Sequence, residues 1–358
     1  MAIQEIDLRH TNDGKLRVVG VHEDGSEEPV DVAVGSVIEE TDSLDPVAAV
    51  DVEQIAADPT DVPPPIDRDE PVEHDVTLQV EEVTAEIEPG VTFDFLTFEG
   101  QVPGPMIRVR EGDTVSFTIE NPSDSSLPHN NDFHAVYGTG GGSEATMTLP
   151  GNASDVEFRC EYPGAFIYHC AVPSMDYHIS AGMFGMILVE PADGLPPVDR
   201  EFYLGQHEVY TKGDAGEEGH HDFDFDAMVD ERPTYVLFNG EKQGYASGNR
   251  GPLSASVGET ARVYMVNGGP NLTSSFHPIG NVWSELYRSG DLVSDPARNV
   301  ETTGIPPGCA VVGDMELPVP ETIKFVDHAL SRVVHKGLLA ELEVTGPENP
   351  DVFDPDPG

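Results

Sequence analysis

Positive charge is scarce in this chain. Its 358 residues include 18 Lys and Arg against 66 Asp and Glu, giving a formal net charge of -48, and only five of the basic residues are Lys. Such a surface repels phosphate groups, which excludes nucleic-acid binding. The acidic residues are spread between apolar segments along the whole chain, so the composition does not indicate global disorder. We interpret it as the solvated acidic surface of a halophilic protein, because salt at about 1 M screens charges over roughly 3 Å.

Cysteine pairs and long apolar runs are also lacking. Three cysteines, Cys160, Cys170 and Cys309, do not make a disulfide framework, and we expect Cys160 and Cys309 to pack as small apolar residues. No run of about 18 apolar residues is present, so no membrane span is predicted. The first residues of the sequence, 1–5, show neither a basic nor an apolar leader, so no export signal is visible.

What the chain has instead is turn residues and alternating strands. It contains 36 Gly and 31 Pro residues. Segments such as residues 75–81 alternate polar and apolar side chains, as a half-buried strand does. Short strands separated by such turns predict an all-β fold, a Greek-key β-sandwich or barrel. We expect four parts: an acidic N-terminal extension or linker, two sandwich domains and an acidic tail, spanning residues 1–71, 72–192, 193–347 and 348–358.

The second predicted domain repeats the first. Gly112 is followed nine residues later by Asn121, and the same spacing separates Gly258 from Asn267. The match continues to the loop that closes each domain, where the second copy has no cysteine. The sequence therefore predicts two tandem sandwiches of one kind, with a thiolate metal site only in the first.

Four candidate metal ligands occur in a fixed order in the first domain. A histidine comes first, and a C-x7-H-x4-M pattern follows it; these residues are His129, Cys170, His178 and Met183. A thiolate, two imidazoles and a weak axial thioether are the ligands of a mononuclear blue-copper site. Met175 is a rival axial ligand, but Met183 has the expected spacing from His178.

A second set of histidines lies beside the first. Neighbouring side chains on a strand point to opposite faces, so His169 can face away from the metal of Cys170, and His134 away from that of His129. Two imidazoles need a third ligand, and His328 of the second domain can supply it. Three imidazoles with an open fourth position are typical of a catalytic metal site. The alternative is that His328 is a buried, hydrogen-bonded core histidine.

Two residues could deliver protons to such a site. Asp132 lies two positions from His134, so on an extended segment both side chains would face one side. Asp132 could then hydrogen-bond a metal-bound ligand and carry a proton. His277 is a second candidate acid, because imidazoles titrate near neutral pH. The alternative for Asp132 is one more acidic surface residue among the 66.

Together these segments resemble the copper-containing nitrite reductases. The resemblance runs from about residue 72 to residue 346, and its motifs are residues 129–134, 168–170, 178–183 and 327–328. It implies two cupredoxin domains, a homotrimer and the dissimilatory reduction of nitrite to nitric oxide with one electron and two protons. It also implies an exported protein at the outer face of the cell membrane, and a small electron donor such as a cupredoxin.

The resemblance also assigns roles to individual residues, and it implies two coppers in each subunit. It implies that the type 1 copper, which accepts electrons, is bound by His129, Cys170, His178 and Met183. It implies that the type 2 copper is bound by His134, His169 and, from a neighbouring subunit, His328. The other roles it implies are proton handling by Asp132 and His277, a substrate-pocket wall at Ile279, and a hydrogen-bond network that orients the catalytic histidine at Glu301 and Thr302.

Three other functions compete with this one. A multicopper oxidase needs a trinuclear cluster built from His-x-His pairs, but none of the 13 histidines has another histidine two positions away. A blue-copper electron carrier would need neither the duplicated domain nor the second set of histidines. A non-catalytic structural protein would not need intact ligand sets.

Overall fold

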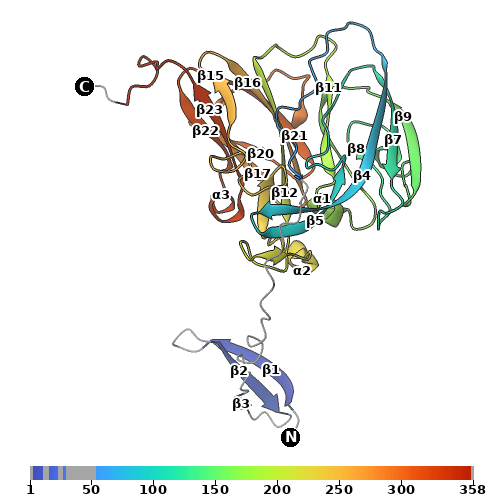
Figure 1. The fold of residues 1–358 in the computed structure, drawn as a ribbon, viewed down its shortest axis with the longest axis vertical. Helices are drawn as coiled ribbons and strands as arrows, with labels where there is room; N and C mark the ends of the chain where they lie inside the picture. The colour runs from blue at the N-terminus through green and yellow to red at the C-terminus, as the bar shows by residue number, and fades with distance from the viewer. Residues whose placement is uncertain (1–2, 11–15, 23–26, 30–53, 356–358) are drawn as a thin grey trace. The chain divides into compact units, whose positions relative to one another are not determined.

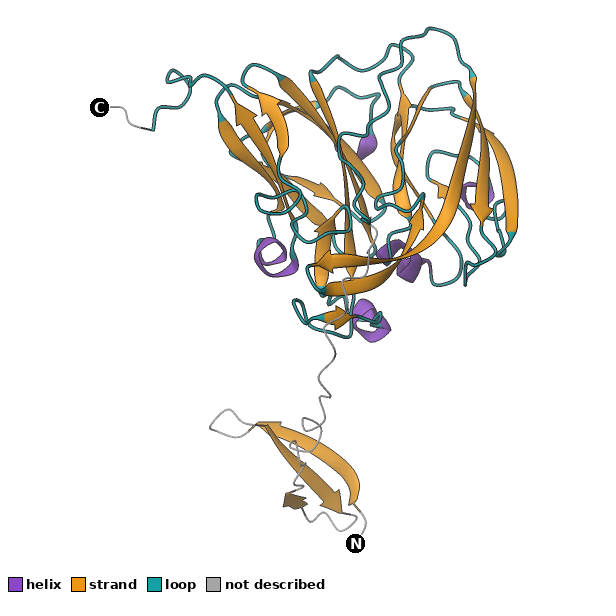
Figure 2. Ribbon diagram, in the orientation of Figure 1, coloured by secondary structure: helices purple, strands orange, loops and turns teal. Residues whose placement is uncertain are grey.

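The computed structural model consists almost entirely of β-strands and loops (Figure 2). The described residues are 3–10, 16–22, 27–29 and 54–355. The chain divides into two compact units, residues 1–50 and 51–358. In the first unit, the described residues form an antiparallel sheet in the order β1-β2-β3, with bounds Ile3–His10, Leu16–His22 and Glu27–Pro29. Residues 30–53, within the predicted N-terminal extension or linker, lie outside the described residues.

The second unit begins with a β-sandwich that carries most of the predicted ligands (Figure 1). One sheet has the order β13-β5-β4-β7-β9, with bounds Gly219–His220, Val91–Phe98, Glu73–Glu88, Thr114–Asn121 and Asn152–Arg159. The other has the order β6-β11-β10-β8, with bounds Ile107–Arg110, Phe184–Glu190, Gly164–His169 and Asp132–Phe133. Alternate residues of β4 are buried, as the sequence pattern predicts for a half-buried strand.

A second sandwich follows in the same unit. Its larger sheet has the order β14-β12-β16-β21-β18-β19, with bounds Tyr235–Phe238, Arg200–Val209, Thr260–Gly269, Cys309–Glu316, Trp283–Tyr287 and Ala297–Val300. Its other sheet has the order β15-β23-β22-β17-β20, with bounds Leu253–Ser256, Leu339–Thr345, Glu321–Asp327, Ser274–Ile279 and Thr303–Ile305. Here β23 is parallel to β15 and antiparallel to β22, as β11 is parallel to β6 and antiparallel to β10. The predicted all-β fold with two sandwiches of one kind is confirmed.

The repeated Gly and Asn residues have the same roles in both sandwiches. Gly112 and Gly258 have φ angles of 91° and 90°, a conformation that glycine adopts without steric cost. The side-chain amide of each asparagine donates to two backbone carbonyl groups. These carbonyls are those of Leu127 and Thr148 for Asn121, and those of Leu272 and Ile305 for Asn267. The sequence repeat is therefore a repeat of turn geometry.

In the part of the chain that the structure describes, helices are few and short. They are α1, α2 and α3, at Met175–Ser180, Phe225–Val229 and Ser331–Lys336, and two 3-10 turns at Thr139–Gly142 and Arg288–Gly290. Among the described residues, no helix has both the length and the apolar composition to cross a membrane.

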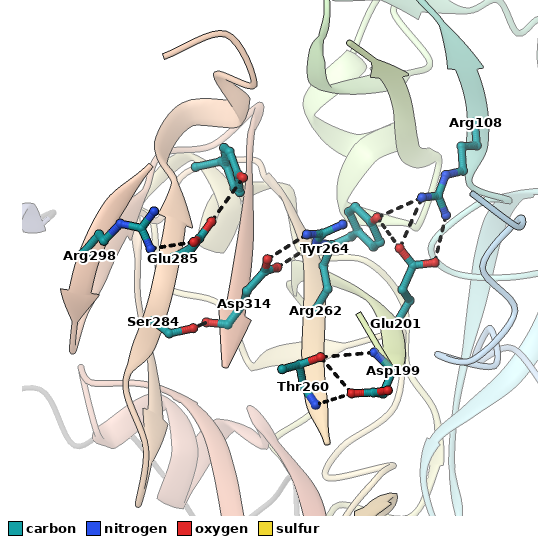
Figure 3. A network of polar contacts seen from close by, with 11 residues as sticks. Arg108, Asp199, Glu201, Thr260, Arg262, Tyr264, Ser284, Glu285, Arg298 and Asp314 are labelled. Carbon is teal, nitrogen blue, oxygen red and sulfur yellow. Dashed lines mark hydrogen bonds and ion pairs between the residues drawn. The ribbon is translucent and has the colours of Figure 1, made fainter. Parts of the chain in front are cut away.

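A buried ionic network ties the two sandwiches together (Figure 3). The sandwiches pack through β10 and β11 of the first and β16 and β21 of the second. At this boundary the Arg108 guanidinium donates to Glu190 of the first sandwich at 2.5 Å and to Glu201 of the second at 2.9 Å. It also lies 3.3 Å from the hydroxyl of Tyr264. Because the buried guanidinium of Arg108 binds a carboxylate of each sandwich, this pairing holds the two domains in a defined relative position.

Part of the predicted N-terminal extension packs onto both sandwiches. Ile55 and Ala57 are buried, and the backbone of this segment pairs with Val102 of the first sandwich. The hydroxyl of Tyr245, in the second sandwich, donates to the carbonyl oxygen of Ala57. Residues 55–57 are therefore an ordered strap across the two domains.

Candidate metal centres

Three predicted ligands converge in the first sandwich. His129 pairs with Thr148 through two backbone hydrogen bonds, Cys170 follows the end of β10, and His178 lies on α1. Their side chains are 0%, 0% and 3% exposed, and their ligand atoms lie within 4.8 Å of one another. We call His129, Cys170 and His178 the first cluster.

The electrostatics of the first cluster fit a soft metal ion. Burial lowers the pKa of both His129 and His178 to about 4, so both imidazoles are neutral at ordinary pH. Nδ1 of His178 is buried without a hydrogen-bond partner, and Nδ1 of His129 lies 3.7 Å from Sγ of Cys170. Burial raises the pKa of the Cys170 thiol to about 11. A bound cation would satisfy the free nitrogen and stabilise the thiolate, so these residues fit copper.

Of the two candidate axial methionines, Met183 is the one whose backbone is hydrogen-bonded to residues of the first cluster. Met183 is fully buried, and its backbone bonds to His178 at 3.0 Å and to Cys170 at 3.1 Å. Met175, the rival axial ligand, is 48% exposed. Cys160 is buried as expected, whereas Cys309 is half-buried, and neither forms a disulfide.

The side chain of Asn130 positions the first cluster, a role that the sequence analysis did not identify. Its Oδ1 accepts a hydrogen bond from the Ala171 amide at 2.7 Å and lies 3.7 Å from Sγ of Cys170. Its Nδ2 donates to the carbonyl of Ser143 at 3.0 Å. Asn130 therefore holds the loop of Cys170 against the segment of His129. In the sequence, only the position of Asn130 directly after His129 pointed to this role.

His134 and His169 form the core of a second cluster. Their Nε2 atoms are 3.1 Å apart, and Nδ1 of His169 donates to the carbonyl of Cys170 at 2.9 Å. That bond leaves Nε2 of His169 with a lone pair. Two lone pairs at this separation repel each other unless a proton or a cation lies between them, so the pair fits a metal ion.

Asp132 completes the second cluster on the same face. It lies opposite His169 in the pairing of β8 with β10, and its carboxylate lies within 4.8 Å of both imidazoles. The glycine-rich turn covers it: a Cβ at Gly141, whose φ is 56°, would lie 2.0 Å from Oδ1 of Asp132. Only glycine therefore leaves room for the carboxylate. We call Asp132, His134 and His169 the second cluster.

The other predicted residues gather on the second sandwich. His328, which follows β22, is exposed, and its ring centroid lies 5.5 Å from that of His277. Nδ1 of His277 donates to the backbone carbonyl of Glu301 at 2.6 Å, so the main chain of Glu301 orients this ring. Thr302 is half-buried next to it, and Ile279 is 39% exposed at the end of β17.

Within one copy of the described chain, the second cluster does not include His328. The group of ligand atoms around His134 contains only His169 and Asp132. His134 and His328 are both exposed, so His328 is not the buried core histidine of the alternative interpretation. Each sandwich thus presents an exposed half-site.

Comparisons with known proteins agree with this geometry. A family model described as multicopper oxidase matches residues 79–194. The copper-containing nitrite reductase of Neisseria meningitidis is 45% identical over 303 residues, covering 84% of this chain and 76% of the relative. That of Pseudomonas chlororaphis is 33% identical over 283 residues, covering 74% of this chain and 76% of the relative.

Solved structures show the same similarity. The copper nitrite reductase from Nitrosomonas europaea has a TM-score of 0.69 and 35% identity, covering 78% of this chain and 96% of that one. A solved multicopper oxidase has a TM-score of 0.64 at 24% identity, covering 76% of this chain and 89% of that one. At that identity the second likeness concerns the fold alone.

Proposed function

We infer nitrite reduction from one premise: this chain belongs to the family of copper-containing nitrite reductases. The reaction takes up one electron and two protons, breaks one N–O bond of nitrite, and releases nitric oxide and water. The observation that supports it best is the adjacency of Cys170 and His169. These neighbours in sequence belong to the first and second clusters, so a single peptide unit links the two.

We assign the two clusters to two different coppers in each subunit. The residues that would hold the type 1 copper are His129, Cys170, His178 and Met183. Those that would hold the type 2 copper are His134 and His169, with His328 of a neighbouring subunit. Copper bound at the first cluster would accept one electron, and copper bound at the second would supply it to nitrite.

The residues around the second cluster bind the substrate and move protons. The carboxylate of Asp132 lies within 4.8 Å of the ligand nitrogens of His134 and His169, so it can hydrogen-bond to an anion bound beside them and deliver one proton to the departing oxygen. His277, which is fixed by the carbonyl of Glu301 and comes with His328 from the neighbouring subunit, delivers the other proton. Ile279 is exposed beside His277 and limits the space for the anion.

The exposed half-sites support a homotrimer. His134 on one subunit and His328 on the next would meet across the interface, which buries both imidazoles and completes three-histidine coordination. In a closed ring of three copies, each subunit gives one half-site and receives the other.

The decisive experiment measures nitric oxide formed from nitrite by the copper-loaded protein with a reduced artificial donor, together with copper per chain. We expect nitrite-dependent nitric oxide and two coppers per chain. A value near one copper without nitric oxide would favour the electron carrier. A fully loaded trimer without activity would refute nitrite reduction.

We propose that an electron-donor protein docks over α1 and α2. The ring of Tyr177 contacts that of His178 at 5.6 Å and that of Phe225 at 5.3 Å. Around it Met175, Phe225 and Val229 are 48%, 51% and 77% exposed. An exposed apolar surface this close to a ligand of the first cluster fits the apolar face of a small cupredoxin.

Val229→Glu should raise the KM for such a donor about tenfold, the scale of one interface residue worth ~1.4 kcal/mol. Turnover with a small artificial donor should not change. Val293→Glu, which alters a valine that is 73% exposed on a loop outside α1 and α2, serves as the control. Equal KM values for the donor in both variants would place the docking surface elsewhere.

We propose that the protein works in high salt outside the cytoplasm. The charge of -48 would make the compact state repel itself at low ionic strength. Dialysis from molar salt into dilute buffer should therefore unfold the protein, which circular dichroism would detect. An unchanged melting temperature in dilute buffer would contradict halophily, and fractionation of the source cells would test the location.

A further inference from the structure

His328 is held almost entirely through its main chain. Its backbone N–H donates to the carbonyl of Ser275 at 2.8 Å, while its exposed ring faces His277. A histidine that binds a metal on another subunit has no contact with that subunit before the oligomer assembles. The other metal ligands therefore cannot orient it in the free subunit. Its own subunit must therefore orient it in advance.

The carboxylate of Asp327, the residue before His328, accepts hydrogen bonds from the main chain on either side of this segment. Asp327 is fully buried at the end of β22, and its Oδ1 accepts from the Ala329 amide at 2.9 Å. The same oxygen accepts from the Ser275 amide at 3.0 Å. One carboxylate oxygen thus binds the residue after His328 and the strand that carries His277.

Arg332, on α3, compensates the buried charge. Its guanidinium pairs with Oδ2 of Asp327 and donates to the carbonyl of Thr273 at 2.7 Å. Thr273 immediately precedes β17, so this bond ties α3 to the strand that carries His277. Without Arg332, the carboxylate would remain buried with only two amide donors, an unfavourable state.

We propose that Asp327 and Arg332 are positioning residues that hold His328 in the orientation needed to complete the type 2 site of the neighbouring subunit. The inference rests on the proposed function. It adds a residue pair that touches neither substrate nor metal and acts through the main chain on both sides of His328. Through Ser275 and Thr273, the pair also fixes the segment of His328 to the strand that carries His277.

The test compares Asp327→Ala, Asp327→Asn and Arg332→Gln in the copper-loaded oligomer. We expect Asp327→Ala to weaken type 2 copper binding by about 10- to 100-fold, the usual effect of removing a residue that orients a metal ligand. The type 2 paramagnetic resonance signal should be lost or altered while the blue absorption persists. Asp327→Asn keeps an oxygen acceptor for Ser275 and Ala329, so it should restore most of the binding. Arg332→Gln should lie between the two.

A matched control separates positioning from general stability. Asp314 forms a buried pair with Arg262 at 2.7 Å in the other sheet of the same domain (Figure 3). Asp314→Ala should lower the melting temperature without a selective loss of type 2 copper. Wild-type copper affinity in both Asp327→Ala and Arg332→Gln, or an equal loss in Asp314→Ala, would overturn the proposal. A wild-type protein with a single copper would instead refute the proposed function.

Discussion

His134→Ala should abolish nitrite reduction while the blue absorption of the first cluster remains. The substitution removes one of two facing imidazoles of the second cluster, and the remaining His169 and Asp132 cannot supply three-histidine coordination. Because these ligands act as a unit, we expect turnover to fall by roughly 10³-fold or more. The first cluster should be unaffected, since its three ligand atoms lie together without His134. Nitric oxide formation and visible absorption, measured on the same preparation, test both expectations.

Copper analysis of the same variant adds a second readout. The copper content should fall from two per chain toward one. His220→Ala is a suitable control, because His220 is exposed and belongs to neither cluster. If His134→Ala removed the blue colour as well, our division of the ligands between two sites would be wrong.

The two clusters could be predicted because their members lie close together in the sequence. Cys170, His178 and Met183 lie on the connection between β10 and β11, and period-two alternation places His169 on the opposite face from Cys170. The Gly and Asn repeat likewise predicted the second sandwich, since each residue satisfies a local turn. Spacing alone was sufficient for these features.

The supporting contacts could not be predicted, because they join distant parts of the chain. Arg108 contacts Glu201, and Asp327 contacts Ser275; periodicity within a strand does not encode such pairings. The ordered segment around Ala57 had the composition of an acidic linker, yet it packs because its few apolar residues meet Val102. Tertiary packing overrides composition at such positions.

The role of Asp132 shows how the structure sharpens a sequence-based prediction. Because Asp132 is one of 66 acidic residues, its residue type alone did not distinguish a functional acid from a surface acid. The pairing of β8 with β10 sets it opposite His169, and the close approach of Gly141 fixes its carboxylate. A surface acid in another strand would lack both restraints.

Asp132→Asn should therefore lower turnover by about 10² to 10⁴-fold, the usual contribution of general acid catalysis, with both coppers retained. The amide has the same shape and can still hydrogen-bond to nitrite, but it cannot pass on a proton. The KM for nitrite should consequently change much less than kcat. Steady-state nitric oxide formation gives both constants, and Asp124→Asn, at an exposed position, is the control. If Asp132→Asn kept wild-type kcat, proton delivery would belong to another group, and His277→Asn would then have to account for the whole effect.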